Sequence, residues 1–66
     1  MTQGITPRQA DKAIRSKLPV KIRDLMYNDT HTVLITGRDR WHITIQTAGG
    51  VLNELDRSNF EIIGER

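Results

Sequence analysis

The chain has 66 residues, no cysteine and a formal net charge of +2 at pH 7. This length predicts one small domain, and the lack of cysteine excludes disulfides and thiolate metal sites. No apolar run approaches the roughly 18 residues that a membrane-spanning helix needs, and Met1–Ile5 is too short and too polar for a secretory signal. We therefore expect a soluble, cytoplasmic protein. Because a domain this small has few other sources of stability, we also expect a homo-oligomer.

The charges are unevenly distributed along the chain. Residues 1–23 carry six basic side chains and one acidic side chain, a net charge of +5. Residues 24–66 carry four basic and seven acidic side chains, a net charge of −3. Such an asymmetry is typical of a basic face that meets phosphate groups, although an ordinary solvated surface would give the same pattern.

The segment Thr6–Gln9 predicts the start of a helix. Thr6 can accept a hydrogen bond from a backbone N–H, Pro7 suits the first helical position, and Gln9 can complete a capping box. A helix is expected over about residues 7–17, because Pro19 then ends it. Its apolar stripe would contain Ala10, Ala13, Ile14 and Leu18. Its opposite side would carry the basic residues Arg8, Lys12 and Arg15.

From Val20 onward the apolar pattern changes to the period of two that is typical of strands. The expected strands are Val20–Arg23, His31–Ile35, Trp41–Gln46, Val51–Leu55 and Phe60–Ile63. The expected turns are Asn28–Thr30, Gly37–Asp39, Ala48–Gly50 and Asp56–Asn59. A slip in the alternation near Arg23–Asp24 predicts a β-bulge there. One helix before five short strands predicts a mainly β fold, a strongly bent, SH3-like open barrel over about residues 20–63.

Three aromatic residues could take part in binding. Phe60 is in phase with the apolar face of its strand and is expected in the core. Trp41 is in phase with Ile43 and Ile45, which favours a core position, but it also follows Arg40, so an exposed indole and a guanidinium could share one loop. Tyr27 is the aromatic residue that we most expect to be exposed.

A catalytic or metal site is not expected from the sequence. His31 and His42 are eleven residues apart on different predicted strands, and a metal ion would need three or more ligands at supportive spacing. No glycine-rich phosphate loop is present, because Gly49–Gly50 is not followed by a lysine and a helix. We therefore predict a protein that is not an enzyme and has no cofactor and no metal.

Two segments resemble motifs of the Sm-like family, and of the bacterial Hfq proteins in particular. Arg38–Ile45 is similar to the end of the first Sm motif, in which an aspartate precedes an aromatic residue and an alternating strand. Leu55–Ile63 is similar to the second motif, a basic and small-polar turn between the last two strands. Val33 stands where the first motif has a glycine, and the lysine-histidine pair of the bacterial second motif is absent.

This resemblance implies an N-terminal helix and a five-stranded, strongly bent open barrel. It implies that Asp39 orders its loop and that Arg57–Asn59 lies at the pore of a ring, beside the loop of Arg38 and Arg40. It also implies that the fourth strand of one subunit pairs with the fifth strand of the next, and that the basic helix lies on the face that meets RNA.

The sequence therefore favours a nucleic-acid-binding protein, with RNA preferred over DNA. The predicted contacts are Arg8, Lys12, Arg15, Tyr27, Arg38, Arg40, Arg57 and Asn59. The alternative is a protein-interaction module, an adaptor or a small inhibitor of a protein partner, on the same barrel. In that case the acidic second half of the chain would contribute Asp24, Asp29, Glu54, Asp56, Glu61 and Glu65.

Overall fold

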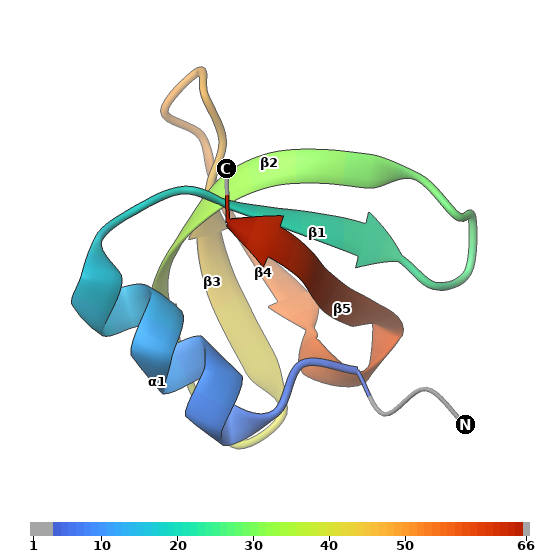
Figure 1. Ribbon diagram of the computed structural model, residues 1–66, viewed down its shortest axis with the longest axis horizontal. Coiled ribbons are helices and arrows are strands. Elements are labelled where there is room, and N and C mark those ends of the chain that lie inside the picture. Colours follow the sequence, from blue (N-terminus) through green and yellow to red (C-terminus); the bar gives the residue numbers. More distant parts are fainter. Residues whose placement is uncertain (1–3, 66) are drawn as a thin grey trace.

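The computed structural model describes residues 4–65, with the backbone alone at Glu65, as one N-terminal helix followed by five strands (Figure 1). The elements are α1 Pro7–Ser16, β1 Val20–Asp24, β2 Thr30–Arg38, β3 His42–Gln46, β4 Leu52–Asp56, the 3-10 turn η1 Arg57–Asn59, and β5 Phe60–Glu65. The first three residues, on which the expectation about a secretory signal mainly rests, lie outside the described part. Within residues 4–65, no helix has the length and apolar character needed to cross a membrane.

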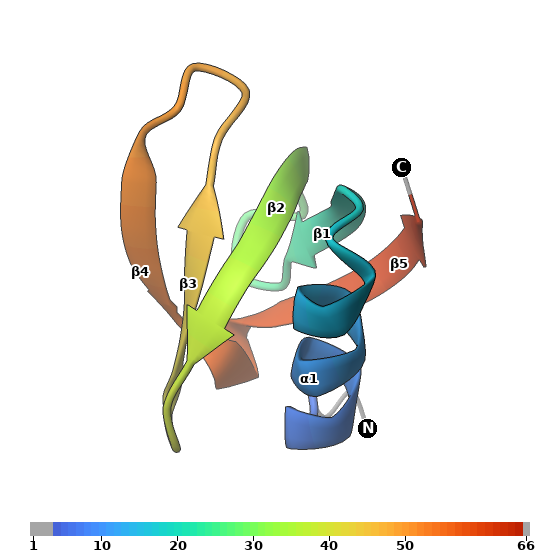
Figure 2. The same ribbon diagram turned by 90° about the vertical axis from the view of Figure 1, so that its left-hand side faces the viewer.

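All five strands form one antiparallel sheet in the order β4-β3-β2-β1-β5. Figure 2 shows that β5 runs across the direction of β2, β3 and β4, with α1 beside β2. The sheet is not closed, because β4 and β5 form its two edges. The predicted mainly β class, with one N-terminal helix and five strands, is therefore confirmed.

Helix α1 begins at the predicted capping box. The Thr6 hydroxyl accepts the Gln9 backbone N–H at 3.1 Å, and the Gln9 side chain accepts the Thr6 backbone N–H at 3.0 Å. The helix ends at Ser16, because Lys17 adopts a left-handed conformation with φ 56°. Leu18 thus lies beyond the helix and is exposed, so its predicted place in the apolar stripe is wrong.

The core lies between α1 and the concave face of the sheet. Its buried members are Ile5, Ala10, Ala13, Val20, Ile22, Val33, Ile35, Ile43, Ile45 and Phe60. The residues from β1, β2 and β3 alternate along their strands, which is the pattern of a sheet with one buried face. Burial of each large aliphatic side chain contributes about 1.5–3 kcal/mol. The predicted burial of Phe60 is confirmed.

The predicted bulge near Arg23–Asp24 is not present. Strand β1 ends at Asp24, whose Oδ1 accepts the backbone N–H groups of Met26 at 2.8 Å and Tyr27 at 3.2 Å. The slip in the apolar pattern therefore marks a turn. The irregularity in the pairing of β1 with β5 lies elsewhere, since Lys21 pairs with Gly64 and Ile22 pairs with Ile62.

Strand β2 is longer than predicted and includes two residues of the expected turn at Gly37–Asp39. The pairing of β2 with β3 shifts between Ile35 and Gly37, so Thr36 is an extra residue in the ladder. This bulge lets the strand continue to Arg38, and the turn occupies residues 39–41 instead. The predicted turn at Ala48–Gly50 is confirmed.

Candidate nucleic-acid interface

The turn between β2 and β3 is held by Asp39. Its Oδ1 accepts the backbone N–H groups of Trp41 and His42, each at 2.8 Å, and the Asp39 N–H donates to the His42 carbonyl at 2.9 Å. These backbone hydrogen bonds stabilise the charged carboxylate and lower the pKa of Asp39. The Asp39 side chain therefore stabilises the turn in which it lies.

Trp41 projects from this turn toward solvent with 63% of its surface exposed. Of the two positions considered for Trp41, the favoured core position is wrong and the exposed position beside Arg40 is confirmed. Strand β3 begins only at His42, so the alternation of Ile43 and Ile45 does not extend back into the turn. The guanidinium carbon of Arg40 lies 5.6 Å from the centroid of the indole ring. This distance is typical of a cation–π contact, worth about 0.5–1 kcal/mol at an exposed site. An exposed indole and a cation thus share one loop.

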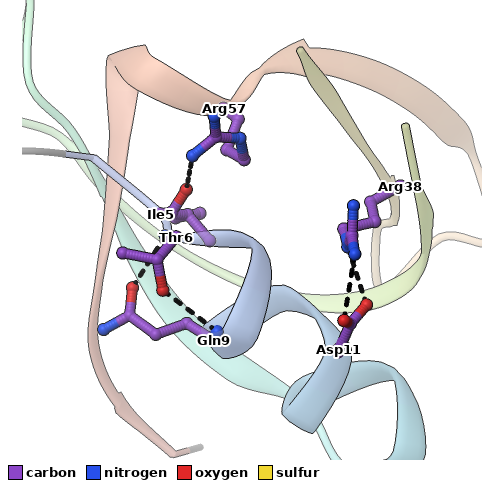
Figure 3. A network of polar contacts seen from close by, with 6 residues as sticks. All are labelled: Ile5, Thr6, Gln9, Asp11, Arg38 and Arg57. Carbon is purple, nitrogen blue, oxygen red and sulfur yellow. Dashed lines mark hydrogen bonds and ion pairs between the residues drawn. The ribbon is translucent and has the colours of Figure 1, made fainter. Parts of the chain in front are cut away.

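Arg57 connects the η1 turn through hydrogen bonds to the loop of Trp41 and to Ile5. Its backbone N–H donates to the Trp41 carbonyl at 2.9 Å, and its Nη1 donates to the Ile5 carbonyl at 2.6 Å (Figure 3). The Ile5 N–H in turn donates to the Arg57 carbonyl at 3.1 Å. Gly4 makes this approach possible, because a Cβ there would lie 2.8 Å from the Arg57 carbonyl oxygen. Arg57 therefore binds its own chain and positions the loop of Trp41.

Arg38 also binds its own chain. Its Nε lies 2.7 Å from Oδ1 of Asp11, and its Nη2 lies 3.0 Å from Oδ2, so the pair is bidentate (Figure 3). The hydrogen bond lowers the pKa of Asp11 and raises the pKa of Arg38. This ion pair attaches the end of β2 to the surface of α1.

The basic side chains of α1 are exposed as predicted. Arg8 and Arg15 are three residues before and four residues after Asp11, so they flank the ion pair with Arg38 on one helix face. Lys12 is also exposed. None of these three bases forms an ion pair within residues 4–65. The structure thus brings the helix cations near Arg38 at the end of β2.

Tyr27 lies in a turn that contacts the η1 turn at Asn59. Tyr27 is 71% exposed in the turn after β1. The Leu25 N–H donates to the Asn59 carbonyl at 2.9 Å, so the turn of Tyr27 adjoins η1. The η1 turn therefore lies between two loops that each carry an exposed aromatic side chain, Trp41 and Tyr27. Sequence reasoning did not identify this arrangement, because only the tertiary hydrogen bonds show it.

A second group of polar side chains lies on β3, β4 and the Asp39 turn. Asp39, His42 and Glu54 each offer one potential metal-ligand atom, and these atoms all lie within 4.8 Å of one another. The sequence did not indicate this group, because its members are spread over residues 39–54. Glu54 pairs with Thr44, two residues from His42. The predicted turn at Ala48–Gly50 could have indicated this group, since the turn joins β3 to β4 in the register that places Glu54 diagonally across from His42.

The contacts predicted from the sequence thus separate into two kinds. Arg38 and Arg57 hold parts of the chain together, while the α1 cations, Arg40, Tyr27 and Asn59 are exposed. Trp41 is an addition to the predicted set. No protein-family model, curated protein or solved structure matches this chain, so its function has to be inferred from these residues and their geometry.

Proposed function

We propose that this protein is an SH3-like open barrel, similar to the Sm-like family, that binds single-stranded nucleic acid as a homo-oligomer, with RNA preferred. The observation that carries the proposal is the exposed Trp41 with the Arg40 guanidinium 5.6 Å from its ring, in a loop attached to the η1 turn. Aromatic side chains next to cations are the common means of binding unpaired bases and their phosphates.

In this proposal one base stacks on the indole of Trp41, and Arg40 meets the adjacent phosphate. Tyr27, across the η1 turn, offers a second stacking surface, and the exposed amide of Asn59 can hydrogen-bond a base edge. Further phosphates meet Arg8, Lys12 and Arg15 on α1. Arg38 and Arg57 act indirectly, because their guanidinium groups already bind Asp11 and the Ile5 carbonyl.

The proposed oligomer uses the two free edges of the sheet. Leu52 on β4 and Ile63 on β5 are exposed, at 61% and 42%. Pairing of β4 from one copy with β5 from another would satisfy the edge hydrogen bonds and cover these side chains. A ring built in this way would repeat the Trp41 loop and multiply weak contacts to one strand of RNA.

The test is a titration with single-stranded RNA and DNA oligomers of equal length. Trp41 is the only tryptophan, so stacking should quench the intrinsic fluorescence, more strongly with RNA. In an anisotropy assay with labelled RNA, Trp41→Ala should weaken binding by about 5-fold to 150-fold, whereas Trp41→Phe should retain most of it. Arg8→Ala, Lys12→Ala and Arg15→Ala should each lower the slope of log affinity against log salt by about one.

Lys21→Ala is the matched control, because Lys21 is an exposed base on β1 that takes no part in the proposed site. It should leave the Trp41 quenching unchanged. Absence of both quenching and anisotropy change at about 50 mM salt would contradict the proposal, because electrostatic binding is strongest at low salt.

A second candidate function is a protein-interaction module. It is favoured by the exposed apolar residues Val51 and Leu52, which are followed along β4 by the exposed acidic residues Glu54 and Asp56. Affinity capture after nuclease treatment separates the two functions. A stoichiometric partner protein that survives the nuclease supports this candidate, and loss of all captured material supports the nucleic-acid proposal.

A further inference from the structure

Asp39, His42 and Glu54 form a group of side chains that could hold a metal ion. Its potential ligand atoms come from the turn after β2, from β3 and from β4, and all lie within 4.8 Å of one another. Nδ1 of His42 lies 3.4 Å from Oδ1 of Asp39. Two ligands of a tetrahedral zinc ion, each about 2.0–2.1 Å from the metal, are about 3.3 Å apart. The imidazole and the Asp39 carboxylate thus lie close enough to share an ion.

The donor set indicates which ion would bind. One imidazole nitrogen and two carboxylate oxygens suit zinc and neighbouring transition metals, whereas magnesium and calcium prefer oxygen ligands alone. Two carboxylates also balance the charge of a divalent cation. Asp56 pairs with His42 in the ladder of β3 and β4 and adds a third negative charge nearby.

The surroundings allow an ion to enter and be held. Asp39 and Glu54 are exposed and His42 is partly exposed, so the ion can enter directly from solvent. Asp39 is already fixed by two backbone N–H groups through Oδ1. His42 and Glu54 lie on paired strands, whose ladder fixes their separation. Asp39 therefore requires little ordering when the ion binds, and the sheet fixes the backbone positions of His42 and Glu54.

We propose that Asp39, His42 and Glu54 bind one zinc ion through one donor atom each, with water in the remaining position. The bound ion would link the turn of Trp41 to β3 and β4. Since it binds the folded chain in preference to the unfolded chain, it would also raise the stability of a domain that has no disulfide. This proposal is independent of nucleic-acid binding.

The test is isothermal titration of the chelator-treated 66-residue chain with zinc chloride. One ion per chain is expected, with a rise in the melting temperature, and magnesium chloride should give neither effect. Glu54→Gln and His42→Ala should each weaken zinc binding by about tenfold or more, because each removes a ligand. His31→Ala is the matched control, since His31 is an exposed histidine outside the group, and it should leave the affinity unchanged.

NMR of the histidine rings provides an independent readout at the ligand itself. Zinc should shift the ring signals of His42 and leave those of His31 in place. Glu54→Gln keeps the test valid if His42→Ala fails to fold, because Glu54 is exposed on an edge strand. Zinc binding that is absent, that Glu54→Gln does not weaken, or that shifts His31 instead would overturn the proposal.

Discussion

The guanidinium of Arg57 donates to the Ile5 carbonyl, and its backbone N–H donates to the carbonyl of Trp41. The Nε atom of the same side chain is buried and has no hydrogen-bond partner within the described residues. A buried donor without a partner lowers the free energy of unfolding, and the surrounding contacts must offset this loss. Arg57 therefore acts as a structural residue, and its effect on ligand binding would be transmitted through the position of Trp41.

Three carboxylates respond to pH in the same direction. Hydrogen bonds lower the pKa of Asp11 through Arg38, of Asp39 through backbone N–H groups, and of Asp56 through Ser58, each from an ordinary value of 3.8. Because the unfolded chain binds these protons more tightly, acidification adds protons to the unfolded state first. The contribution to the free energy of unfolding is present above pH 3.8 and is lost as the pH falls through the lowered pKa values.

Urea unfolding between about pH 7 and about pH 2 measures this effect. The free energy of unfolding should fall on the acid side, and a triple variant with Asp11→Asn, Asp39→Asn and Asp56→Asn should show a smaller fall. Asp29→Asn, at an exposed carboxylate in the connection after β1, is the control and should retain the acid dependence of the unmodified chain. An equal acid dependence in the triple variant would contradict the assignment to these carboxylates.

The exposure of Trp41 and the burial of Ile5 are two features that the sequence pattern does not predict. Trp41 shares the parity of Ile43 and Ile45, but parity predicts burial only inside a strand, and the strand begins after Trp41. Ile5 is fully buried although it precedes the helix, because Arg57 holds it through tertiary hydrogen bonds. The role of Asp39 was expected from the resemblance of its segment to the first Sm motif, whereas the neighbours of Arg57 depend on the whole fold.

At the scale of elements, α1 is the segment that the sequence predicts best, because its signals are local. The capping box, the proline in the first turn and the burial of Ala10 and Ala13 all involve residues within one helix. Strand β2 is predicted less well, since its bulge at Thr36 depends on pairing with β3. The final strand pairing, β5 with β1, joins residues that are 36 to 45 positions apart, and no local pattern indicates it.

The two ends of α1 should respond to mutation in opposite directions. Thr6→Ala removes the acceptor for the Gln9 N–H and should lower the free energy of unfolding by about 1 kcal/mol. Lys17→Gly should raise it by up to about 1 kcal/mol, because glycine tolerates the φ of 56° at the end of the helix. Urea unfolding measures both. Thr6→Ser, which keeps a hydroxyl, is the control, and equal stability of the alanine and serine variants would exclude the capping role.

At the scale of the whole molecule, the order β4-β3-β2-β1-β5 determines which kind of assembly is possible. The two free edges belong to different strands, so a contact that pairs β4 of one copy with β5 of the next is heterologous. One such contact leaves a free edge on each copy, so its repetition produces a closed ring or an open chain. The proposed assembly therefore predicts a ring or a filament.

Edge substitutions test this assembly. A lysine in place of Leu52 or Ile63 adds a charge at an exposed edge position, so each variant should dissociate toward a monomer of 7.6 kDa while its circular dichroism spectrum stays unchanged. Light scattering coupled to size exclusion measures the mass. Leu18→Lys is the matched control, because Leu18 is 45% exposed but lies in the connection after α1, and it should keep the assembled mass. A monomeric unmodified chain would contradict edge pairing, because β4 and β5 lie at opposite ends of one sheet and can pair with each other only across different copies.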